Sequence, residues 1–251
     1  MKQGVTMPLR HQSAKPSHYD SAAEHYDLLN EENSKEINAL IVSILKRYGA
    51  GRVVDFTCGT GSQVFALAAE GFEVVGVDIN QAMLEVARKK GGEIELIEGD
   101  MRSTCVGEFD AALTVFNAIG HLTSADFEMA VRNMASNLKG GGLYVFDIFN
   151  LDFLLFEDQI TQLTIDWYKG NRVREIQYST IDEEGVLASF TTSIVGGDPV
   201  ESSQTLQVYR AADLREMLKR NGFEAVEQYS ADGSPLDPVK SERILTVARV
   251  T

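Results

Sequence analysis

Residues 53–63 of the chain read Val53-Val54-Asp55-Phe56-Thr57-Cys58-Gly59-Thr60-Gly61-Ser62-Gln63. The stretch opens with β-branched residues that favour a strand, turns through closely spaced glycines, and continues into residues that favour a helix. Glycine has no Cβ, so a bound ligand can come within contact distance of the backbone at such a turn. The stretch therefore predicts a strand, a tight turn and a helix that form a cradle for a nucleotide-like cofactor.

Two classes of cofactor site use a glycine turn of this kind, and neighbouring residues separate them. Dinucleotide sites have the pattern G-x-G-x-x-G, in which the third glycine allows close packing of the helix on the strand. Val64 stands at that third position here, which disfavours a nicotinamide-dependent oxidoreductase. Acidic residues instead mark successive strand ends: Asp55 lies four residues before Gly59, Asp78 follows the next strand, and Asp100 follows the strand after that.

This arrangement resembles the class I S-adenosylmethionine methyltransferases, closely over about residues 50 to 150 and in general plan over the rest. The resemblance implies S-adenosyl-L-methionine as the cofactor and S-adenosyl-L-homocysteine as the product. It also implies a set of cofactor-binding residues, which are Asp55, Gly59, Gly61, Asp78, Ile79, Asp100, Met101 and Phe116.

The acids of this set have roles in the resemblance that match their chemistry. Asp78 is placed to accept hydrogen bonds from both ribose hydroxyls, and Asp100 to accept one from the adenine amine while the Met101 N–H meets a ring nitrogen. Asp55 and the backbone carbonyl near Phe116 are expected to receive the methionine ammonium. The structural alternatives are that Asp55 caps the turn and Asp78 the next helix. The joint spacing of the acids favours the cofactor roles.

Strands and helices are expected to alternate through the first part of the chain. The strands are predicted over residues 52–56, 73–77, 94–97, 109–115 and 142–148, and the helices over 62–70, 81–90 and 124–138. Val-rich strands that alternate with helices form parallel sheets buried on both faces. A helix over 212–220 and strands over 223–229 and 242–250 are expected to complete the sheet. The predicted fold class is α/β, with a doubly wound, mostly parallel seven-stranded, Rossmann-like sheet.

The sequence divides into a tail, a core, an insertion and a C-terminal part. A mobile tail is expected over residues 1–17, the cofactor-binding core with an N-terminal lid over 18–150, and the C-terminal helix and strand pair over 209–251. Within the core, Asn33 is expected to cap a helix, with Glu36 completing a capping box. Residues 151–208 contain strand-like segments separated by glycine-bearing turns, which predict an inserted antiparallel β meander. We expect this meander to cover the substrate; the alternative is a dimerisation sheet, so a homodimer stays open.

Two further segments extend the resemblance toward the methyl acceptor. The segment Ala23-Glu24-His25-Tyr26-Asp27 resembles the lid of many small-molecule methyltransferases, in which a tyrosine at the position of Tyr26 lies over the cofactor and faces the substrate. The segment from Phe116 to Leu122 resembles deoxyamino-sugar N-methyltransferases, where a residue at the position of His121 lies near the substrate amine. Tyr26 and His121 are therefore the candidate catalytic residues, and His121 either accepts a proton or only orients the amine. The candidate substrate contacts are Tyr19, Asn117, Asp147 and Trp167.

Composition limits the classes of partner. The formal net charge is −14, and so negative a surface repels phosphate backbones, which disfavours nucleic acid and favours a small molecule. No run approaches the roughly 18 apolar residues of a membrane span, and the first residues lack the apolar centre of a signal peptide, so we expect a cytoplasmic protein. Cys58 and Cys105 are expected to be free thiols, and no metal site is expected.

These residues together predict an enzyme, a methyltransferase dependent on S-adenosylmethionine. It is expected to move a methyl group by in-line displacement to a nitrogen, less favourably an oxygen, of a small-molecule acceptor. Two alternatives stay open. One is an RNA-methylating enzyme whose basic surface comes from a partner subunit, and the other is a partner protein that binds S-adenosylmethionine without transferase activity.

Overall fold

The computed structural model describes residues 10–20, 23–157, 160–168, 171–195 and 199–251. Its main sheet has seven strands in the order β10-β11-β5-β4-β1-β2-β3. The strands from β5 to β3 in this order pair in parallel, whereas β11 runs antiparallel to β5 and to β10. Their bounds are β1 (Arg52–Asp55), β2 (Glu73–Asp78), β3 (Glu95–Glu98), β4 (Phe109–Thr114), β5 (Leu138–Phe149), β10 (Phe223–Tyr229) and β11 (Arg243–Val250). The predicted α/β fold class is confirmed, with strand boundaries that shift by a few residues.

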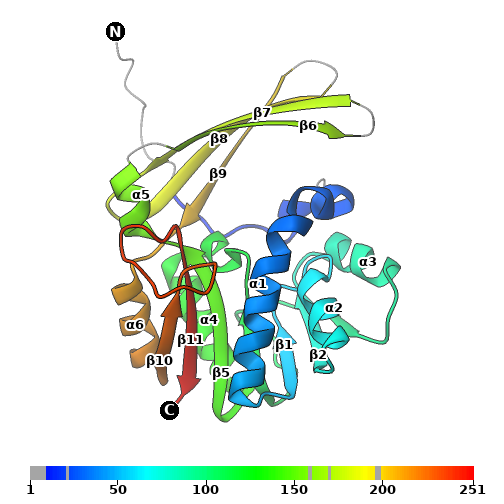
Figure 1. Ribbon diagram of the computed structural model, residues 1–251, viewed down its shortest axis with the longest axis vertical. Coiled ribbons are helices and arrows are strands. Elements are labelled where there is room, and N and C mark those ends of the chain that lie inside the picture. Colours follow the sequence, from blue (N-terminus) through cyan, green and yellow to red (C-terminus); the bar gives the residue numbers. More distant parts are fainter. Residues whose placement is uncertain (1–9, 21–22, 158–159, 169–170, 196–198) are drawn as a thin grey trace.

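Helices cover both faces of this sheet (Figure 1). The α-helices are α1 (Tyr26–Tyr48), α2 (Ser62–Ala69), α3 (Gln81–Lys89), α4 (Ser124–Ser136), α5 (Leu151–Glu157) and α6 (Ala211–Arg220), and the 3₁₀ helices are η1 (Pro16–Tyr19), η2 (Ala23–His25) and η3 (Ala118–His121). One buried apolar cluster joins Ile41 of α1 and Leu67 of α2 to the sheet. The other joins Phe127 of α4 and Leu214 of α6 to the opposite face. The sheet is therefore buried on both sides, as its Val-rich strands predict.

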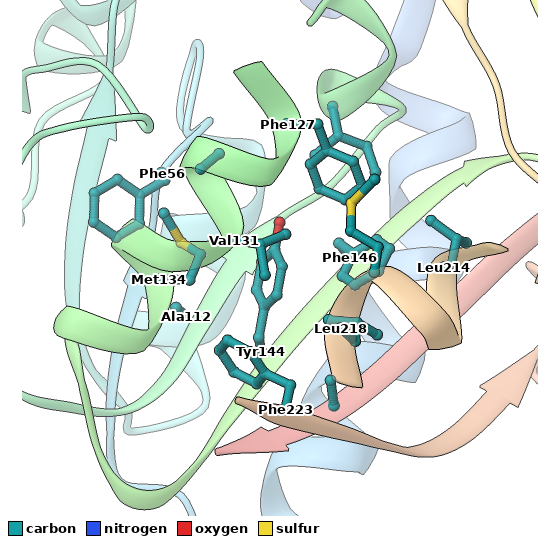
Figure 2. Close-up of a cluster of buried hydrophobic side chains, with 14 of the residues drawn as sticks. Phe56, Ala112, Phe127, Val131, Met134, Tyr144, Phe146, Leu214, Leu218 and Phe223 are labelled. Carbon is teal, nitrogen blue, oxygen red and sulfur yellow. The ribbon is translucent and has the colours of Figure 1, made fainter. Parts of the chain in front are cut away.

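Tyr144 of β5 lies in the middle of the second cluster, between Val131 of α4 and Phe223 of β10 (Figure 2). Its side chain is fully buried, and its hydroxyl lies 2.6 Å from the hydroxyl of Thr114. A buried phenol needs such a partner, because an unpaired hydroxyl in an apolar core is destabilising. The pair links β5 to the last residue of β4, the strand that leads into the site described below.

The inserted segment forms a second, antiparallel sheet of four strands in chain order. These are β6 (Ile160–Tyr168), β7 (Asn171–Ile181), β8 (Val186–Val195) and β9 (Val200–Gln207). The chain leaves the core at Asn150 and returns at Tyr209, and these residues form a bridge. The buried Asn150 amide donates hydrogen bonds of 2.8 Å to the backbone oxygens of Pro238 and Ser241, which fixes this junction. The inserted sheet arches over the carboxyl ends of the parallel strands (Figure 1).

The start of α1 differs from its prediction. The sequence pattern predicts a helix capped by Asn33, but α1 begins at Tyr26, so Asn33 lies inside the helix and cannot cap it. The first turn is held by tertiary contacts instead, because Asp27 accepts a hydrogen bond from the Thr60 hydroxyl and pairs with Lys90. Local sequence could not show this, since these partners lie on other elements. Glu36 is thereby free of the capping role.

Residues 10–17 correct the predicted boundary of the tail. The His11 side chain forms hydrogen bonds with the Thr205 hydroxyl (3.0 Å) and the Leu122 carbonyl (2.9 Å). The Ser13 hydroxyl donates a hydrogen bond to Asp126. This segment therefore packs against η3, α4 and the inserted sheet rather than extending as a tail, and residues 1–9 lie outside the described part of the chain.

In the described part of the chain, we find no helix with the length and apolar character that crossing a membrane requires. Cys58 and Cys105 are free cysteines, as predicted. The described residues also contain no cluster of three or more His, Cys, Asp or Glu side chains arranged to hold a metal ion. A cytoplasmic location stays a prediction of the sequence.

Candidate active site

The larger cavity, about 570 Å³, lies at the carboxyl ends of β1, β2, β3 and β4. Ligands bind at this edge in open α/β sheets because the loops that leave parallel strands meet there. The predicted site residues that line it are Tyr19, Tyr26, Asp55, Gly59, Asp78, Ile79, Asp100, Met101, Phe116 and His121. The structure therefore brings the predicted cofactor residues together with both candidate catalytic residues, and Gly61 is the exception.

The structure gives different reasons for the glycines at positions 59 and 61 of the turn. Gly59 lines the cavity with φ +52°, and its N–H donates a hydrogen bond of 2.8 Å to Asp78. Gly61 precedes α2 with φ +95°, and a Cβ there would overlap the ring of Phe65. Gly61 is not among the residues that line the cavity. Backbone conformation and packing explain why residue 61 is a glycine. A direct contact between Gly61 and the cofactor stays a prediction.

Asp78 lies at the end of β2 and holds two loops by its carboxylate. One oxygen accepts the Gly59 N–H and the other accepts the Asn80 N–H, each at 2.8 Å. Burial raises the pKa of Asp78 despite these hydrogen bonds, which act to lower it. A carboxylate has about four acceptor positions. Asp78 therefore keeps acceptor capacity that faces the cavity, as the predicted ribose role requires.

Asp55 ends β1 and is fully buried. One carboxylate oxygen accepts the Thr57 N–H at 2.9 Å, and the other, Oδ2, has no hydrogen-bond partner. Burial raises the pKa of Asp55 to about 7, against the lowering effect of the Thr57 hydrogen bonds and with a further increase from Asp78. A buried carboxylate with a free oxygen is a site for a cation, because a positive partner would offset its desolvation.

Asp100 is held in a fixed orientation by Arg102. The Arg102 Nε lies 2.9 Å and 3.0 Å from the two Asp100 oxygens, and Arg102 also pairs with Asp126 at 3.0 Å. Burial acts to raise the pKa of Asp100, but the hydrogen bonds from Arg102 outweigh it and lower the pKa. Asp100 is therefore an anion whose carboxylate oxygens accept several hydrogen bonds from Arg102. Its contact with the adenine amine stays a prediction.

Aromatic side chains from the N-terminal lid and η3 form one wall of the cavity. The Tyr19 hydroxyl lies 2.7 Å from Nε2 of His121, and the Tyr19 and Tyr26 ring centroids are 5.7 Å apart in an edge-to-face arrangement. The His18 ring lies 5.1 Å from that of His121. The His121 backbone oxygen also accepts the N–H of Ala14 at 2.8 Å. The lid is thus attached directly to the candidate catalytic histidine.

The protonation states of this wall follow from its burial. Burial, then the nearby His18 and His11, lower the pKa of His121 to about 4. Burial, with Tyr26 and Asp78, raises the pKa of Tyr19, and burial together with Asp78 raises that of Tyr26. At neutral pH the wall therefore presents a neutral imidazole and neutral phenols, which are hydrogen-bonding groups rather than strong bases.

The backbone after β4 is strained at the cavity. Phe116 (φ 60°) and Asn117 (φ 62°) both adopt the left-handed conformation, which non-glycine residues rarely do. The Asn117 side chain holds this geometry by accepting the N–H of Phe149 at 3.1 Å. Such strain is concentrated at ligand sites in proteins. Phe116 lines the larger cavity and also the smaller cavity described next.

A smaller cavity, about 310 Å³, is lined in part by the same wall. Its lining shares Tyr19, Tyr26, Phe116 and His121 with the larger cavity. The remaining residues that line it are Glu36, Ile37, Asn117, Phe149, Gln204, Leu206, Ala231 and Arg243. Most of these were not predicted, because they come from α1, the inserted sheet and the last strand, and no local motif connects such distant segments.

The remaining predicted substrate contacts are Asp147 and Trp167. Asp147 is buried in β5, forms an ion pair with Arg243 and lines neither cavity, whereas Arg243 lines the smaller one. The backbone of Trp167 lies in β6, opposite Arg172 of β7, and the Trp167 side chain lies outside the described part of the structure. A contact of either residue with the acceptor stays a prediction.

The larger cavity fits S-adenosylmethionine on its own geometry. Its volume of about 570 Å³ is within the range of small-molecule sites, about 300–1,000 Å³. The unpaired Asp55 oxygen suits an ammonium, and the strand-end Asp78 suits ribose hydroxyls. Gly59 brings bare backbone to the cavity wall between them.

Comparison with known proteins agrees with this fit. Residues 53–142 match a family model described as a methyltransferase domain. Glycine N-methyltransferase of Homo sapiens is 28% identical over 215 residues, which cover 73% of each chain. The dTDP-3-amino-3,6-dideoxy-alpha-D-glucopyranose N,N-dimethyltransferase of Streptomyces fradiae is 30% identical over 132 residues, 50% of this chain and 52% of that protein. The structure of an amino pentose methyltransferase from Micromonospora echinaspora, with S-adenosylmethionine bound, has a TM-score of 0.76 at 22% identity and covers 90% of this chain and 96% of that chain.

The family match and the structural similarity support the same conclusion. The matched domain contains the glycine turn and the acids Asp55, Asp78 and Asp100, which line the larger cavity. The structural neighbour shows the same overall fold. Residues 53–142 are therefore similar to a methyltransferase domain, the chain has the fold of S-adenosylmethionine-dependent methyltransferases, and S-adenosylmethionine is the cofactor that fits its larger cavity.

Proposed function

We propose that this methyltransferase transfers the methyl group to a nitrogen atom of a small-molecule amine that binds in the smaller cavity. The observation that carries the proposal is the wall of Tyr19, Tyr26, Phe116 and His121, which lines both cavities. Cofactor on one side of this wall and acceptor on the other would bring the reacting groups together at its side chains. Such positioning supplies much of the acceleration in a displacement reaction.

The acid–base character of the wall favours nitrogen over oxygen. A hydroxyl acceptor must lose a proton to attack, so it benefits from a base with a pKa near neutral. His121, with a pKa of about 4, is a weak base, and the raised pKa values of Tyr19 and Tyr26 keep these phenols neutral. An amine that has lost its proton to water already carries a lone pair. The wall therefore suits an acceptor that needs orientation rather than deprotonation by the enzyme.

When bound, S-adenosylmethionine would supply a methyl carbon that the acceptor's lone pair can attack while the C–S bond breaks and S-adenosylhomocysteine leaves. The chain supplies hydrogen bonds and the exclusion of water around that reaction. The His121 ring and the Tyr19 hydroxyl, 2.7 Å apart, offer a paired donor and acceptor for the amine. The inserted sheet contributes Gln204 and Leu206 to the smaller cavity and so helps to enclose the acceptor.

The smaller cavity carries opposite charges that suit a polar acceptor. Glu36 and Arg243 both line it; Arg243 is paired with Asp147, and its Cζ lies 5.2 Å from the centroid of the Phe149 ring. The relatives named above methylate nitrogen in glycine and in an amino sugar nucleotide. These names support an amine acceptor here, and the net charge of −14 disfavours a polyanionic one.

The test is a screen of amine and hydroxyl metabolites in matched pairs, with S-adenosylhomocysteine release as the readout and product analysis for the methylated atom. We expect methylated nitrogen, with a rate that rises with pH as the acceptor amine loses its proton. Preferential methylation of the hydroxyl member of the pairs would contradict the proposal.

Two variants separate positioning from cofactor binding. Tyr19→Phe removes the hydroxyl beside His121 and should lower kcat by roughly tenfold or more while S-adenosylhomocysteine affinity stays within a few fold. Tyr209→Phe is the control, because Tyr209 is a buried tyrosine that lines neither cavity. Tight cofactor binding without turnover on any acceptor would favour the non-catalytic alternative, and salt-dependent RNA affinity would favour the RNA-methylating one.

A further inference from the structure

Residues 11–14 form a strap along the segment that carries His121. The Ala14 N–H donates a hydrogen bond of 2.8 Å to the His121 carbonyl, and the Thr123 N–H donates one of 2.9 Å to the Ser13 hydroxyl. Since His121 lines both cavities, the strap is attached to the wall that the cavities share.

His11, the first residue of the strap, extends this attachment to the inserted sheet. Its Nε2 lies 2.9 Å from the carbonyl oxygen of Leu122, which caps η3, and its Nδ1 lies 3.0 Å from the Thr205 hydroxyl of β9. A carbonyl oxygen only accepts, so Nε2 donates and, in the neutral ring, Nδ1 accepts the Thr205 proton. The imidazole therefore bridges the end of η3 to β9 and uses both of its nitrogens.

The residues on either side of this contact in β9 line the smaller cavity. They are Gln204 and Leu206, and Thr205 lies between them in the strand. Successive side chains of a strand point to opposite faces, so Thr205 points away from the cavity. Its contact with the strap therefore takes no space from the acceptor, but it fixes the backbone that carries Gln204 and Leu206.

This contact links β9 to the core, whereas a neighbouring side chain of β9 bonds within the insertion. The Gln207 amide donates hydrogen bonds to the carbonyls of Glu184 (2.9 Å) and Gly185 (3.2 Å). β9 is the strand of the inserted sheet that descends toward the core (Figure 1). The bridge through His11 thus joins the core to the part of the insertion that lines the smaller cavity.

We propose that His11 is a positioning residue for the acceptor. Its bridge holds β9 against η3, so Gln204 and Leu206 keep fixed positions relative to His121, which lines the same cavity. The inference rests on the proposed function in one respect, that the acceptor binds in this cavity, and it does not depend on which atom is methylated.

The first measurement needs no acceptor. Hydrogen exchange followed by mass spectrometry compares the parent, His11→Ala and Thr205→Val, each with S-adenosylhomocysteine bound. We expect the amides of β9 to exchange roughly fivefold or more faster in both variants, whereas β3 and β10, at the two edges of the main sheet, serve as unchanged references. The double variant should match His11→Ala, because both changes remove the same bridge. Unchanged exchange of β9, or additive effects in the double variant, would overturn the proposal whatever the acceptor is.

The second measurement uses the acceptor that the screen identifies. His11→Ala and Thr205→Val should each raise the KM for the acceptor by roughly tenfold and leave S-adenosylhomocysteine affinity within about twofold of the parent. His11→Gln should recover part of the loss, because its amide keeps both a donor and an acceptor. Ser203→Ala is the matched control, since it removes an exposed hydroxyl from the same face of β9 and should leave the KM unchanged.

The outcomes separate this proposal from the proposed function. An unchanged KM in His11→Ala, or equal weakening of acceptor and cofactor, would overturn the positioning role. Faster exchange of β9 in a protein for which the screen finds no acceptor would support the bridge and count against the proposed function alone.

Discussion

At the scale of single residues, the buried Asp55 carboxyl makes cofactor binding depend on pH. Its pKa is about 7 in the free protein, so below that pH it is protonated and must lose its proton to receive the cofactor's ammonium. We predict that S-adenosylhomocysteine affinity falls by roughly tenfold for each pH unit below about 7, because one proton is released on binding. Calorimetry between pH 5 and pH 8 (roughly the range over which this carboxyl titrates) measures it.

The matched controls for this prediction are a ligand and a variant. The affinity for 5′-methylthioadenosine, which has no ammonium, should not follow the same slope. Asp55→Asn removes the titrating group and should flatten the slope for S-adenosylhomocysteine. A parent protein with pH-independent affinity would exclude the ammonium contact of Asp55.

The same residue has a predictable effect on stability. The pKa of Asp55 rises from 3.8 to about 7 on folding, so between these values the folded state binds the proton more tightly than the unfolded state. Stability contributed by Asp55 is therefore present at low pH and is lost as the pH rises through this window. Thermal unfolding of Asp55→Asn and parent at about pH 5, inside this window, and at about pH 8, above it, should show the parent gaining relative stability at the lower pH. The opposite trend would contradict the assignment.

Asp78 is predicted to serve both the turn and the ribose. Asp78→Ala should weaken S-adenosylhomocysteine binding by roughly 1.5–3 kcal/mol, the value for hydrogen bonds to a charged group. It should also loosen the turn, because the Gly59 and Asn80 N–H groups both lose their acceptor. An unchanged dissociation constant would rule out the ribose role.

At the scale of elements, Asn80 connects α3 to the N-terminal lid. Its Oδ1 accepts the Met83 N–H at 2.8 Å and caps α3, while its Nδ2 donates to the Pro16 carbonyl (2.7 Å) and to Asp20 (2.8 Å). The N-terminal lid is thus held by the residue that also follows Asp78 by two positions. This contact joins Asn80 to residues 60 and 64 positions away, so no local pattern predicts it.

We predict that Asn80→Ser speeds cofactor release. Serine keeps a capping oxygen but cannot reach the lid, so we expect S-adenosylhomocysteine dissociation to accelerate by roughly tenfold with little change in melting temperature. Stopped-flow dissociation measures the first and thermal unfolding the second. Thr123→Ala is the matched control, because Thr123 caps α4 by its side chain and its loss should lower stability without changing release. Equal release rates in parent and Asn80→Ser would show that the lid does not depend on this contact.

At the scale of the whole molecule, the inserted sheet has its own small apolar cluster beside the α/β core. Its own small apolar cluster, which consists of Leu151, Leu154, Leu187, Leu206 and Val208, lies entirely within the inserted segment. The chain leaves and re-enters the core at the paired residues Asn150 and Tyr209. The chain therefore passes between the two sheets at one junction, and the residues that line the larger cavity lie outside the insertion.

We predict that the core binds the cofactor without the insertion. Replacing residues 151–208 by a short Gly/Ser linker should leave S-adenosylhomocysteine affinity within roughly tenfold of the parent, because the residues that line the larger cavity remain. The rate of methyl transfer should fall by roughly a hundredfold or more, because the acceptor loses its enclosure. Calorimetry and turnover assays distinguish the two effects. Full turnover in the shortened protein would exclude the acceptor-covering role and favour a dimerisation sheet, which sedimentation of the parent would then show directly.

Local sequence was sufficient for the cofactor half of this protein. The glycine turn and the acids at positions 55, 78 and 100 are close in sequence to the strand ends that carry them, and parallel strands bring all their carboxyl ends to one edge. Periodicity likewise predicted the seven-stranded sheet and the inserted meander, because burial on two faces and on one face leave different apolar patterns. These features depend on backbone topology, which short-range patterns determine.

Only the tertiary structure decided the acceptor half. Arg243, Gln204 and Glu36 come from a late strand, the insertion and the first helix, and they meet in one cavity only after the chain has folded. The low pKa of His121 and the unpaired amide of Gln63 depend on burial, which no local pattern specifies. The contacts of His11 with Thr205 and of Ser13 with Asp126 also join residues that are 194 and 113 positions apart. Long-range contacts and desolvation are properties of the packed molecule, so the sequence predicted the residues around the larger cavity and the fold determined which residues line the smaller one.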